Sequence, residues 1–204
     1  MSNFGFISIG SHTGYWLEDE LKNYSNKKII LIEPVKYNLV ELKERVKSYT
    51  NIVIEEVAIS DKDETLPFYF IKRSSIEKLK KHWASGIGSF DKKHILNHRS
   101  KRFQVTEDDI ETTSIKCLSF NSLKIKHSIT SIDKLMLDVE GAEYKILKSI
   151  NLKETLIKNI MFEKKHFDGI FNEGNKLQEI KEILISNGYQ LLEIDKENIL
   201  AKKE

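Results

Sequence analysis

The sequence predicts an α/β protein built on a mostly parallel sheet, and three observations support this prediction. Short apolar runs alternate with amphipathic stretches along the N-terminal part of the chain. The run at residues 28–32 is almost continuously apolar, as is typical of a strand buried on both faces. Near the end, a short turn joins two apolar runs, which indicates an antiparallel hairpin. Right-handed crossovers between the parallel strands would then place helices on both faces of the sheet.

The individual elements follow from the spacing of apolar residues. Pro67 confines its strand to a sheet edge, because proline has no backbone donor. Residues 84–106 show no period, and we expect them to form an irregular insertion over one rim of the sheet. In chain order we expect strands at 4–9, 28–32, 52–57, 65–71, 110–118, 132–138, 159–163, 189–194 and 199–201, and helices over 15–24, 39–46, 74–81, 144–150 and 177–185.

The composition indicates one folded domain. Of the 204 residues, 40% are hydrophobic and 31% are charged, which is typical of a globular chain rather than a disordered one. The single cysteine, Cys117, excludes an internal disulfide. No apolar stretch approaches the ~20 residues of a membrane span, and no leader pattern begins the chain. We therefore expect a cytoplasmic protein with one domain over residues 1–204, including an insertion at about 72–109.

The ends of the first two strands suggest a ligand site, because ligands of open parallel sheets bind beyond the carboxyl ends of the strands. A glycine-bounded loop, Gly10-Ser11-His12-Thr13-Gly14, follows the first strand. Such a loop lets a ligand approach the backbone, although an ordinary turn would look the same. Glu33 ends the second strand and could accept hydrogen bonds from ribose hydroxyls, or simply be solvated. Together they favour an adenosine-like ligand, while the glycine spacing departs from the G-x-G-x-x-G pattern of nicotinamide cofactors.

Acidic residues gather after two later strands. Asp138 ends an apolar strand and is expected to point into the cleft, with Glu140 close behind it. Glu143 has a simpler explanation, because carboxylates favour helix N-termini. Glu163 ends another strand and precedes His166, although a histidine near a loop is more often a surface residue than a catalyst.

Several of these motifs resemble those of a known family. Residues 137–143, Leu-Asp-Val-Glu-Gly-Ala-Glu, resemble the signature of the FkbM family of S-adenosylmethionine-dependent methyltransferases. Further similar blocks are residues 6–15, 32–34 and 57–61, Ile146-Leu147-Lys148, and Phe162-Glu163 with His166. The resemblance covers nearly the whole chain and implies a class I methyltransferase fold, Rossmann-like, with a mostly parallel seven-stranded sheet, a C-terminal antiparallel hairpin and an inserted strand and helix segment.

Two departures from the family pattern affect the expected site. Ser8 stands where relatives usually have an acid, and Ser11-His12 replaces Ala-Asn. Ser8 or backbone carbonyls would then have to hold the amino group of the methionine. The chain also begins at its first strand, so we expect the insertion to carry most of the substrate recognition.

The resemblance implies a cofactor site and a reacting end. S-adenosylmethionine would bind across Gly10, Ser11, His12, Thr13, Gly14, Tyr15, Glu33, Ile59, Ser60 and Asp138. Methyl transfer from a sulfonium is an in-line displacement, so the protein mainly positions the acceptor, helped by a base or a metal. The candidate catalytic residues are Asp138, Glu140, Glu163 and His166, with His12 as a further candidate base. Asp138 and Glu163 would also suit Mg²⁺, which prefers oxygen ligands.

The family resemblance implies O-methylation of a sugar, a glycan or another small-molecule hydroxyl. The alternatives are a nitrogen acceptor, or a nucleotide- or S-adenosylmethionine-binding regulatory module without turnover. A nucleic-acid methyltransferase is disfavoured, because residues 138–141 replace the Asn- or Asp-Pro-Pro-aromatic motif that such enzymes carry after this strand.

A basic segment suggests something about the acceptor. Residues 72–102 contain ten Lys and Arg residues but only Glu77 and Asp91, a formal balance of +8 against +2 for the whole chain. Such a segment could steer an anionic acceptor toward the cleft, or it could be a solvated surface. Its aromatic residues are too sparse to indicate a base-stacking platform for nucleic acid.

Overall fold

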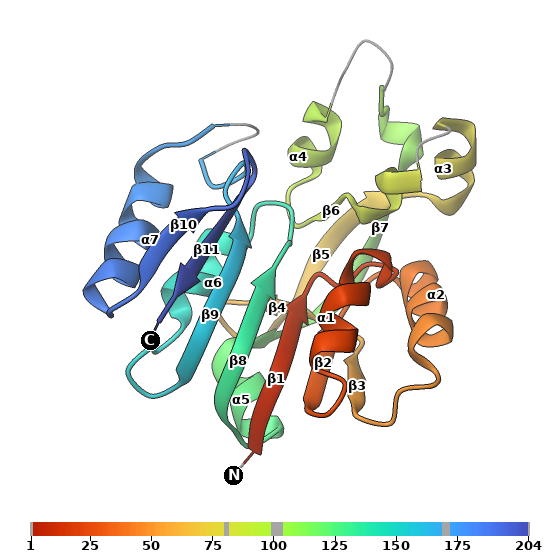
Figure 1. The fold of residues 1–204 in the computed structure, drawn as a ribbon. Helices are drawn as coiled ribbons and strands as arrows, with labels where there is room; N and C mark the ends of the chain where they lie inside the picture. The colour runs from red at the N-terminus through yellow and green to blue at the C-terminus, as the bar shows by residue number, and fades with distance from the viewer. Residues whose placement is uncertain (1, 80–81, 99–103, 169–171, 204) are drawn as a thin grey trace.

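The computed structural model describes residues 2–79, 82–98, 104–168 and 172–203. A seven-stranded sheet in the order β10-β11-β9-β8-β1-β2-β3 forms its centre (Figure 1). Strand β11 runs antiparallel to both β9 and β10, and all other pairs are parallel. The predicted fold class is confirmed. The strands are β1 (Ser2–Ile9), β2 (Lys28–Ile32), β3 (Ile52–Glu55), β8 (Ile129–Leu137), β9 (Leu156–Glu163), β10 (Gln190–Glu193) and β11 (Asn198–Lys202).

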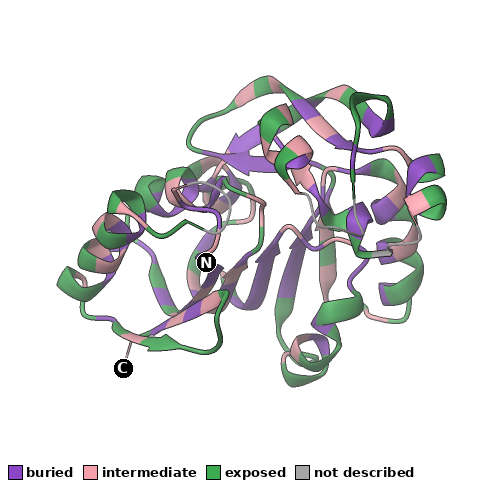
Figure 2. Cartoon of the chain, turned by 90° about the horizontal axis from the view of Figure 1, so that it is seen from above, coloured by how far each residue is buried: buried purple, intermediate pink, exposed green. Residues whose placement is uncertain are grey.

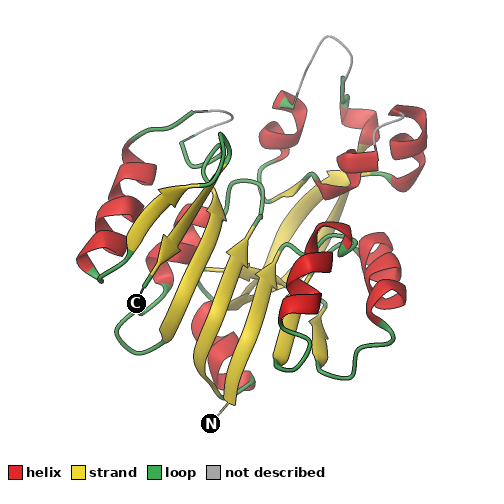
Figure 3. Ribbon diagram, viewed as in Figure 1, coloured by secondary structure: helices red, strands yellow, loops and turns green. Residues whose placement is uncertain are grey.

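Helices cover both faces of this sheet (Figure 3). Alternate side chains of a strand point to opposite faces, so Phe6 packs with the helices of one face and Ile7 with those of the other. The central strands are accordingly buried, while the outer helices keep exposed surfaces (Figure 2). The first face carries the 3-10 turn η1 (Tyr15–Leu17), α1 (Glu18–Asn23) and α2 (Lys36–Val46); the second carries α5 (Phe120–Lys126), α6 (Glu143–Ser149) and α7 (Asn175–Ser186).

The strand register brings the predicted motifs level with one another. Ile9 of β1 pairs with both Ile32 of β2 and Leu137 of β8, and Leu137 pairs with Phe162 of β9. The residues that follow these four in the sequence are Gly10, Glu33, Asp138 and Glu163. Because all four strands run parallel, these residues emerge side by side at one edge of the sheet.

A second, four-stranded sheet stands beside the first, in the order β4-β7-β5-β6. The sequence analysis expected two of its strands but not a separate sheet. Pro67 pairs with Ser114 of β7, while the short β6 reaches only Tyr69 and Phe70. The other flank of Pro67 is therefore an edge, as predicted. The strands are β4 (Ala58–Ser60), β5 (Glu64–Ile71), β6 (Gly88–Ser89) and β7 (Ile110–Ser119).

The insertion is more regular than predicted. The expectation of an irregular segment over 84–106 is wrong, because this stretch contains a helix, α4 (Lys92–Asn97). Asp91 begins the helix by accepting a hydrogen bond from the Lys93 amide, and Ile95 is fully buried. One buried residue on so short a helix leaves no apolar period to detect. The other elements here are α3 (Arg73–Leu79) and the 3-10 turns η2 (His82–Gly86) and η3 (Glu107–Asp109).

Asp109 directly precedes β7, and its side chain holds the insertion in place through contacts with Thr106 and Lys78. Its carboxylate accepts hydrogen bonds from the amide and hydroxyl of Thr106, at 3.0 and 2.8 Å, and lies 3.3 Å from Lys78 Nζ. Burial opposes ionisation, but these hydrogen bonds outweigh it and lower the pKa of Asp109 to about 2.

We expect Asp109→Asn to lower the free energy of unfolding by about 1–2 kcal/mol at neutral pH. A lowered carboxyl pKa stabilises the fold above the unfolded value of 3.8, and this contribution fades as the pH falls from 3.8 toward about 2. Urea unfolding at pH 7 and below pH 4 would measure the difference. Equal midpoints of the two proteins at pH 7 would contradict the assignment.

Candidate functional site

Two adjoining cavities lie at the carboxyl edge of the central sheet. Both are lined by Gly10, Glu33, Gly86, Asp138 and Glu140. The first cavity is mainly apolar, with Ile32, Val57, Ile59, Phe68, Phe90 and Val139 in its walls. The second cavity is polar, and its further lining includes Ser11, His12, Trp16, Trp83, His98, Glu163, Lys165 and Glu197. The loop after β1, the acid after β2 and the acids after β8 and β9 therefore meet in one cleft.

Gly10 allows the loops after β1 and β8 to touch. It has a φ of +85°, and a Cβ atom at this position would lie 1.8 Å from the carbonyl oxygen of Asp138. The amides of Gly10 and Ser11 both donate to the carbonyl of Ile32, at 3.0 and 2.9 Å. Only glycine fits here, because both the backbone conformation and the close approach exclude a side chain.

Glu33 is buried between the two cavities, with 4% of its surface exposed. Its Oε1 accepts hydrogen bonds from the Val35 amide at 2.9 Å and from Asn38 Nδ2 at 3.3 Å, and its Oε2 accepts one from the His12 amide at 2.8 Å. Burial raises the pKa of Glu33 to about 7, although these hydrogen bonds oppose the shift. The carboxylate thus holds the loop after β1 while still facing both cavities.

The insertion closes one side of the cleft through the 3-10 turn η2. His12 Nε2 lies 2.6 Å from the hydroxyl of Ser85, and Asn38 Nδ2 donates to the Ser85 carbonyl at 2.9 Å. Gly86, the next residue, lines both cavities. The insertion therefore reaches the loop after β1 directly and forms a wall of the cleft.

Asp138 and Glu163 form an acidic floor. Asp138 faces the open cleft, but the surrounding walls displace much of its water, and this desolvation together with nearby Glu140 raises its pKa. Glu163 is buried, and burial followed by repulsion from Asp138 and Glu140 raises its pKa as well. Lys165 pairs with Glu163 Oε1 at 2.6 Å and offsets part of this repulsion. The floor therefore places two carboxyl groups beside one lysine, and their mutual repulsion favours the protonated form of one of them.

Glu143 does more than the predicted helix-start charge. It is the first residue of α6, but its side chain is fully buried. Its two oxygens accept hydrogen bonds from the amides of Val139 at 2.8 Å and Gly141 at 2.9 Å, and burial raises its pKa to about 8. The helix-start interpretation therefore covers only part of its role, because Glu143 also holds the loop that presents Asp138 and Glu140.

His166 lies inside the protein rather than on its surface. Its Nε2 is 3.3 Å from Glu140 Oε2 and 3.5 Å from Glu163 Oε2, and burial lowers the pKa of the imidazole to about 3. Two histidines that the sequence analysis did not select, His94 and His98, complete this group from α4 and its end. Their spacing of four residues was the one available signal, because it places two side chains on the same face of a helix.

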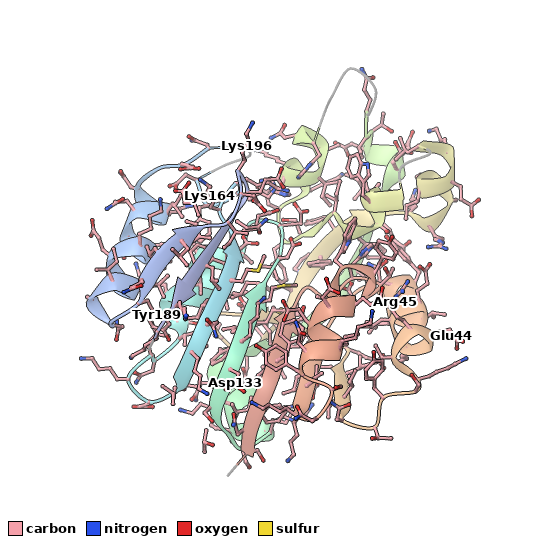
Figure 4. The ribbon with its side chains drawn as sticks, in the orientation of Figure 1. Glu44, Arg45, Asp133, Lys164, Tyr189 and Lys196 are labelled. Atoms are coloured by element: carbon pink, nitrogen blue, oxygen red, sulfur yellow. The ribbon has the colours of Figure 1, made fainter. Side chains whose placement is uncertain are left out.

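The other predicted cofactor residues are divided between the apolar cavity and positions outside the cleft. Ile59 lines the apolar cavity, whereas Ser60 is buried and donates to Asp61 Oδ1 at 3.0 Å. Thr13 and Tyr15 line a separate pocket, where Arg45 Nε donates to the Thr13 carbonyl at 3.0 Å (Figure 4). Gly14 is part of the same turn, and its φ of +73° lets it begin η1.

The basic segment is partly neutralised by acids beyond it in the sequence. Arg73 pairs with Glu41 at 2.8 Å, Lys78 with Asp109 at 3.3 Å and Lys92 with Glu107 at 2.5 Å. The +8 balance of residues 72–102 therefore overstates the charge that this segment presents to solvent. Lys80, Lys81, Arg99, Lys101 and Arg102 lie outside the described residues.

The fold and the cleft define the class of protein: an α/β chain with the sheet order and strand-end site of class I methyltransferases. A sequence model of the Methyltransferase FkbM domain matches residues 8–191. The chain belongs to this FkbM methyltransferase family, which confirms the resemblance seen in its motifs.

Solved structures of methyltransferases are similar to this chain, and the first of them has the same fold. The FkbM methyltransferase from Methylobacillus flagellatus KT matches 98% of this chain with a TM-score of 0.56 and 13% sequence identity, and the chain spans 43% of that protein's length. Precorrin-6y C5,15-methyltransferase from Geobacter metallireducens GS-15 matches 100% of this chain and 82% of its own, with a TM-score of 0.48 and 10% identity. A search of curated proteins found no match. None of the described helices is long and apolar enough to cross a membrane.

Proposed function

We propose that this protein is an S-adenosylmethionine-dependent methyltransferase whose acceptor is a neutral hydroxyl of a sugar, glycan or other small molecule. The proposal rests chiefly on the position of Glu33, a buried carboxylate that lies between the apolar and the polar cavity and next to Gly10. S-adenosylmethionine is a nucleoside joined to a charged tail. It needs an apolar cavity for its base, a carboxylate for its ribose and a polar cavity for its tail, all next to one another.

The residues present fit this cofactor. The apolar cavity, with Ile59 and Phe90 in its walls, suits the adenine ring. Glu33 Oε2 accepts a single protein hydrogen bond among the described residues, which leaves it able to accept another from a ribose hydroxyl. Ser8 is fully buried and lines neither cavity, so its side chain is not available to replace the missing acid. We assign that task to the acids of the polar cavity.

The cofactor supplies an electrophilic methyl group, and the chain supplies position. Asp138 lines both cavities and is therefore next to the junction at which donor and acceptor meet. We assign it the role of accepting a hydrogen bond from the acceptor hydroxyl and orienting its oxygen. Glu140 also lines both cavities, and its Oε2 lies 3.3 Å from Nε2 of the buried His166.

The charge of the polar cavity indicates the acceptor class. Its lining contains Glu33, Asp138, Glu140, Glu163 and Glu197 against Lys165 alone. This lining offers a phosphorylated or acidic acceptor no basic counter-charge beyond Lys165, so the anionic acceptor considered from the basic segment is disfavoured at the reacting end. Two exposed aromatic residues, Trp16 and Trp83, add broad rings at the cavity wall, which suits a polyhydroxylated ring with apolar faces.

An amine acceptor is the second candidate, because the same acids would also attract an ammonium group. A Mg²⁺ ion held by Asp138 and Glu163 stays a prediction. Oxygen atoms of Asp138, Glu143 and Glu163 lie within 4.8 Å of one another, but Glu143 already accepts two amide hydrogen bonds and Glu163 pairs with Lys165.

The test combines cofactor binding with an acceptor screen. Calorimetry should detect S-adenosylmethionine binding, and formation of S-adenosylhomocysteine should depend on a neutral sugar or glycan. Parallel arms with phosphorylated sugars and with amines test the charge argument. Binding without turnover on any acceptor would instead support the regulatory module, and failure to bind S-adenosylmethionine would contradict the proposal.

A further inference from the structure

Three histidines and one glutamate converge beside the cleft. His94 and His98 come from α4 and its C-terminal end, Glu140 from the loop after β8, and His166 from the segment after β9. One ligand atom of each lies within 4.8 Å of one ligand atom of every other. The four side chains are 0% to 13% exposed. Residues separated by up to 72 positions in the sequence thus share one small buried volume.

The distances match the spacing of metal ligands. Glu140 Oε2 lies 3.0 Å from His94 Nε2 and 3.3 Å from both His98 Nε2 and His166 Nε2. His94 Nε2 and His98 Nε2 are 3.0 Å apart. Bonds of about 2.0–2.2 Å from a tetrahedral Zn²⁺ place neighbouring ligand atoms about 3.3–3.6 Å apart. These four contacts lie within a few tenths of an ångström of that spacing, and the ligand atom of His166 lies within 4.8 Å of those of His94 and His98.

Hydrogen bonding among these groups does not account for the arrangement. The 3.0 Å contact between His94 Nε2 and His98 Nε2 needs one nitrogen to present a lone pair. That nitrogen also lies 3.0 or 3.3 Å from Glu140 Oε2, which likewise presents lone pairs. At least one contact is then repulsive, and a cation bound between these atoms turns it into an attraction.

The protein holds Glu140 in an unusual conformation for this purpose. Its φ is +52°, a left-handed value that non-glycine residues adopt only at an energetic cost. Glu143 fixes the flanking amides of Val139 and Gly141, and the Ser89 hydroxyl donates to the Glu140 carbonyl at 3.1 Å. Hydrogen bonds that orient a ligand in this way are typical of metal sites.

We infer that His94, His98, His166 and Glu140 form a binding site for one divalent transition-metal ion, with Zn²⁺ as its resident. Imidazole nitrogens and a carboxylate suit Zn²⁺, whereas Mg²⁺ prefers oxygen ligands. Four protein ligands complete a tetrahedral shell, so the ion acts structurally. It ties α4 of the insertion to the loops after β8 and β9 and holds this wall of the cleft in place. The inference does not depend on the proposed methyl transfer.

Metal titration of the purified full chain, freed of any affinity tag and treated with chelator, tests this inference. The wild-type protein should bind one equivalent of Co²⁺ with the strong visible absorption of four-coordinate cobalt, and Zn²⁺ should displace it. The double variant His94→Gln/His98→Gln should bind at least about 100-fold more weakly, since loss of an outer partner alone costs 10–100-fold. The control His127→Gln removes an equally enclosed histidine that pairs with Glu55 at 2.6 Å, and it should bind as wild type does.

Amide hydrogen exchange provides a second readout, which tests the inference even if the double variant fails to fold. Added Zn²⁺ should slow amide hydrogen exchange in α4 of the wild type and not in Glu140→Gln, because the ion links this helix to the sheet. S-adenosylmethionine binding measured on the same samples separates this result from the proposed function. Substoichiometric Co²⁺ binding by the wild type, or equal binding by the wild type and a folded double variant, would overturn the inference.

Discussion

Glu33→Gln should weaken S-adenosylmethionine binding by about 5- to 150-fold, which corresponds to about 1–3 kcal/mol for lost hydrogen bonds to a charged group. The glutamine keeps one acceptor oxygen, so part of the hydrogen bonding around Val35 and Asn38 survives. Affinity should also rise with pH across about 7 in the wild type. Ionised Glu33 accepts ribose hydrogen bonds better than its protonated form, and its pKa before binding is about 7. The variant should lack this pH dependence.

Calorimetry over a range of pH measures both effects. Glu44→Gln is the matched control, because Glu44 is also a glutamate but its side chain is exposed on the outer surface of α2 (Figure 4). Its cofactor affinity should equal that of the wild type. If Glu33→Gln binds as tightly as the wild type, the ribose role is excluded and Glu33 only anchors the loop through His12.

Asp138→Asn should lower kcat by about 10- to 150-fold with an active acceptor, while the protein stays folded. Asparagine has the same shape but no negative charge, so the charge-assisted hydrogen bond to the acceptor hydroxyl is lost, at about 1.5–3 kcal/mol. A role confined to the reacting step changes kcat more than cofactor affinity. Steady-state kinetics together with calorimetry on the same preparations separate the two quantities.

Asp133→Asn provides the control within the same strand. Asp133 lies in the middle of β8, away from its carboxyl end, and pairs with Lys27 at 2.5 Å and Lys158 at 2.9 Å (Figure 4). Its loss should reduce stability without changing kcat of the folded fraction. Glu143→Gln is unsuitable as a control, because Glu143 holds the loop that carries Asp138. Equal losses of kcat at Asp138 and Asp133 would show that the effect is structural.

Local sequence patterns were sufficient to predict the strands of the central sheet and the polar residues that follow them in the motif blocks. A strand buried on both faces must be apolar throughout, as residues 28–32 are, and such runs identify the order of β1, α1, β2 and α2. The loop after β1, Glu33 and Asp138 could be selected because parallel strands bring their carboxyl ends to one edge. These predictions succeeded because each depends either on the residues of one element or on neighbouring strands whose pairing follows from the fold class.

The second sheet, the buried Glu143 and the histidine group depend on contacts between distant segments. Helix α4 carries a single fully buried residue, Ile95, so its pattern predicted only a loop, and its histidines had no visible partner in the sequence. The partners, Glu140 and His166, come from loops after two different strands, and packing of the insertion against the sheet brings all four side chains together. Apolar periodicity reports the environment of one element at a time, whereas a ligand set made by three segments exists only once those segments have packed.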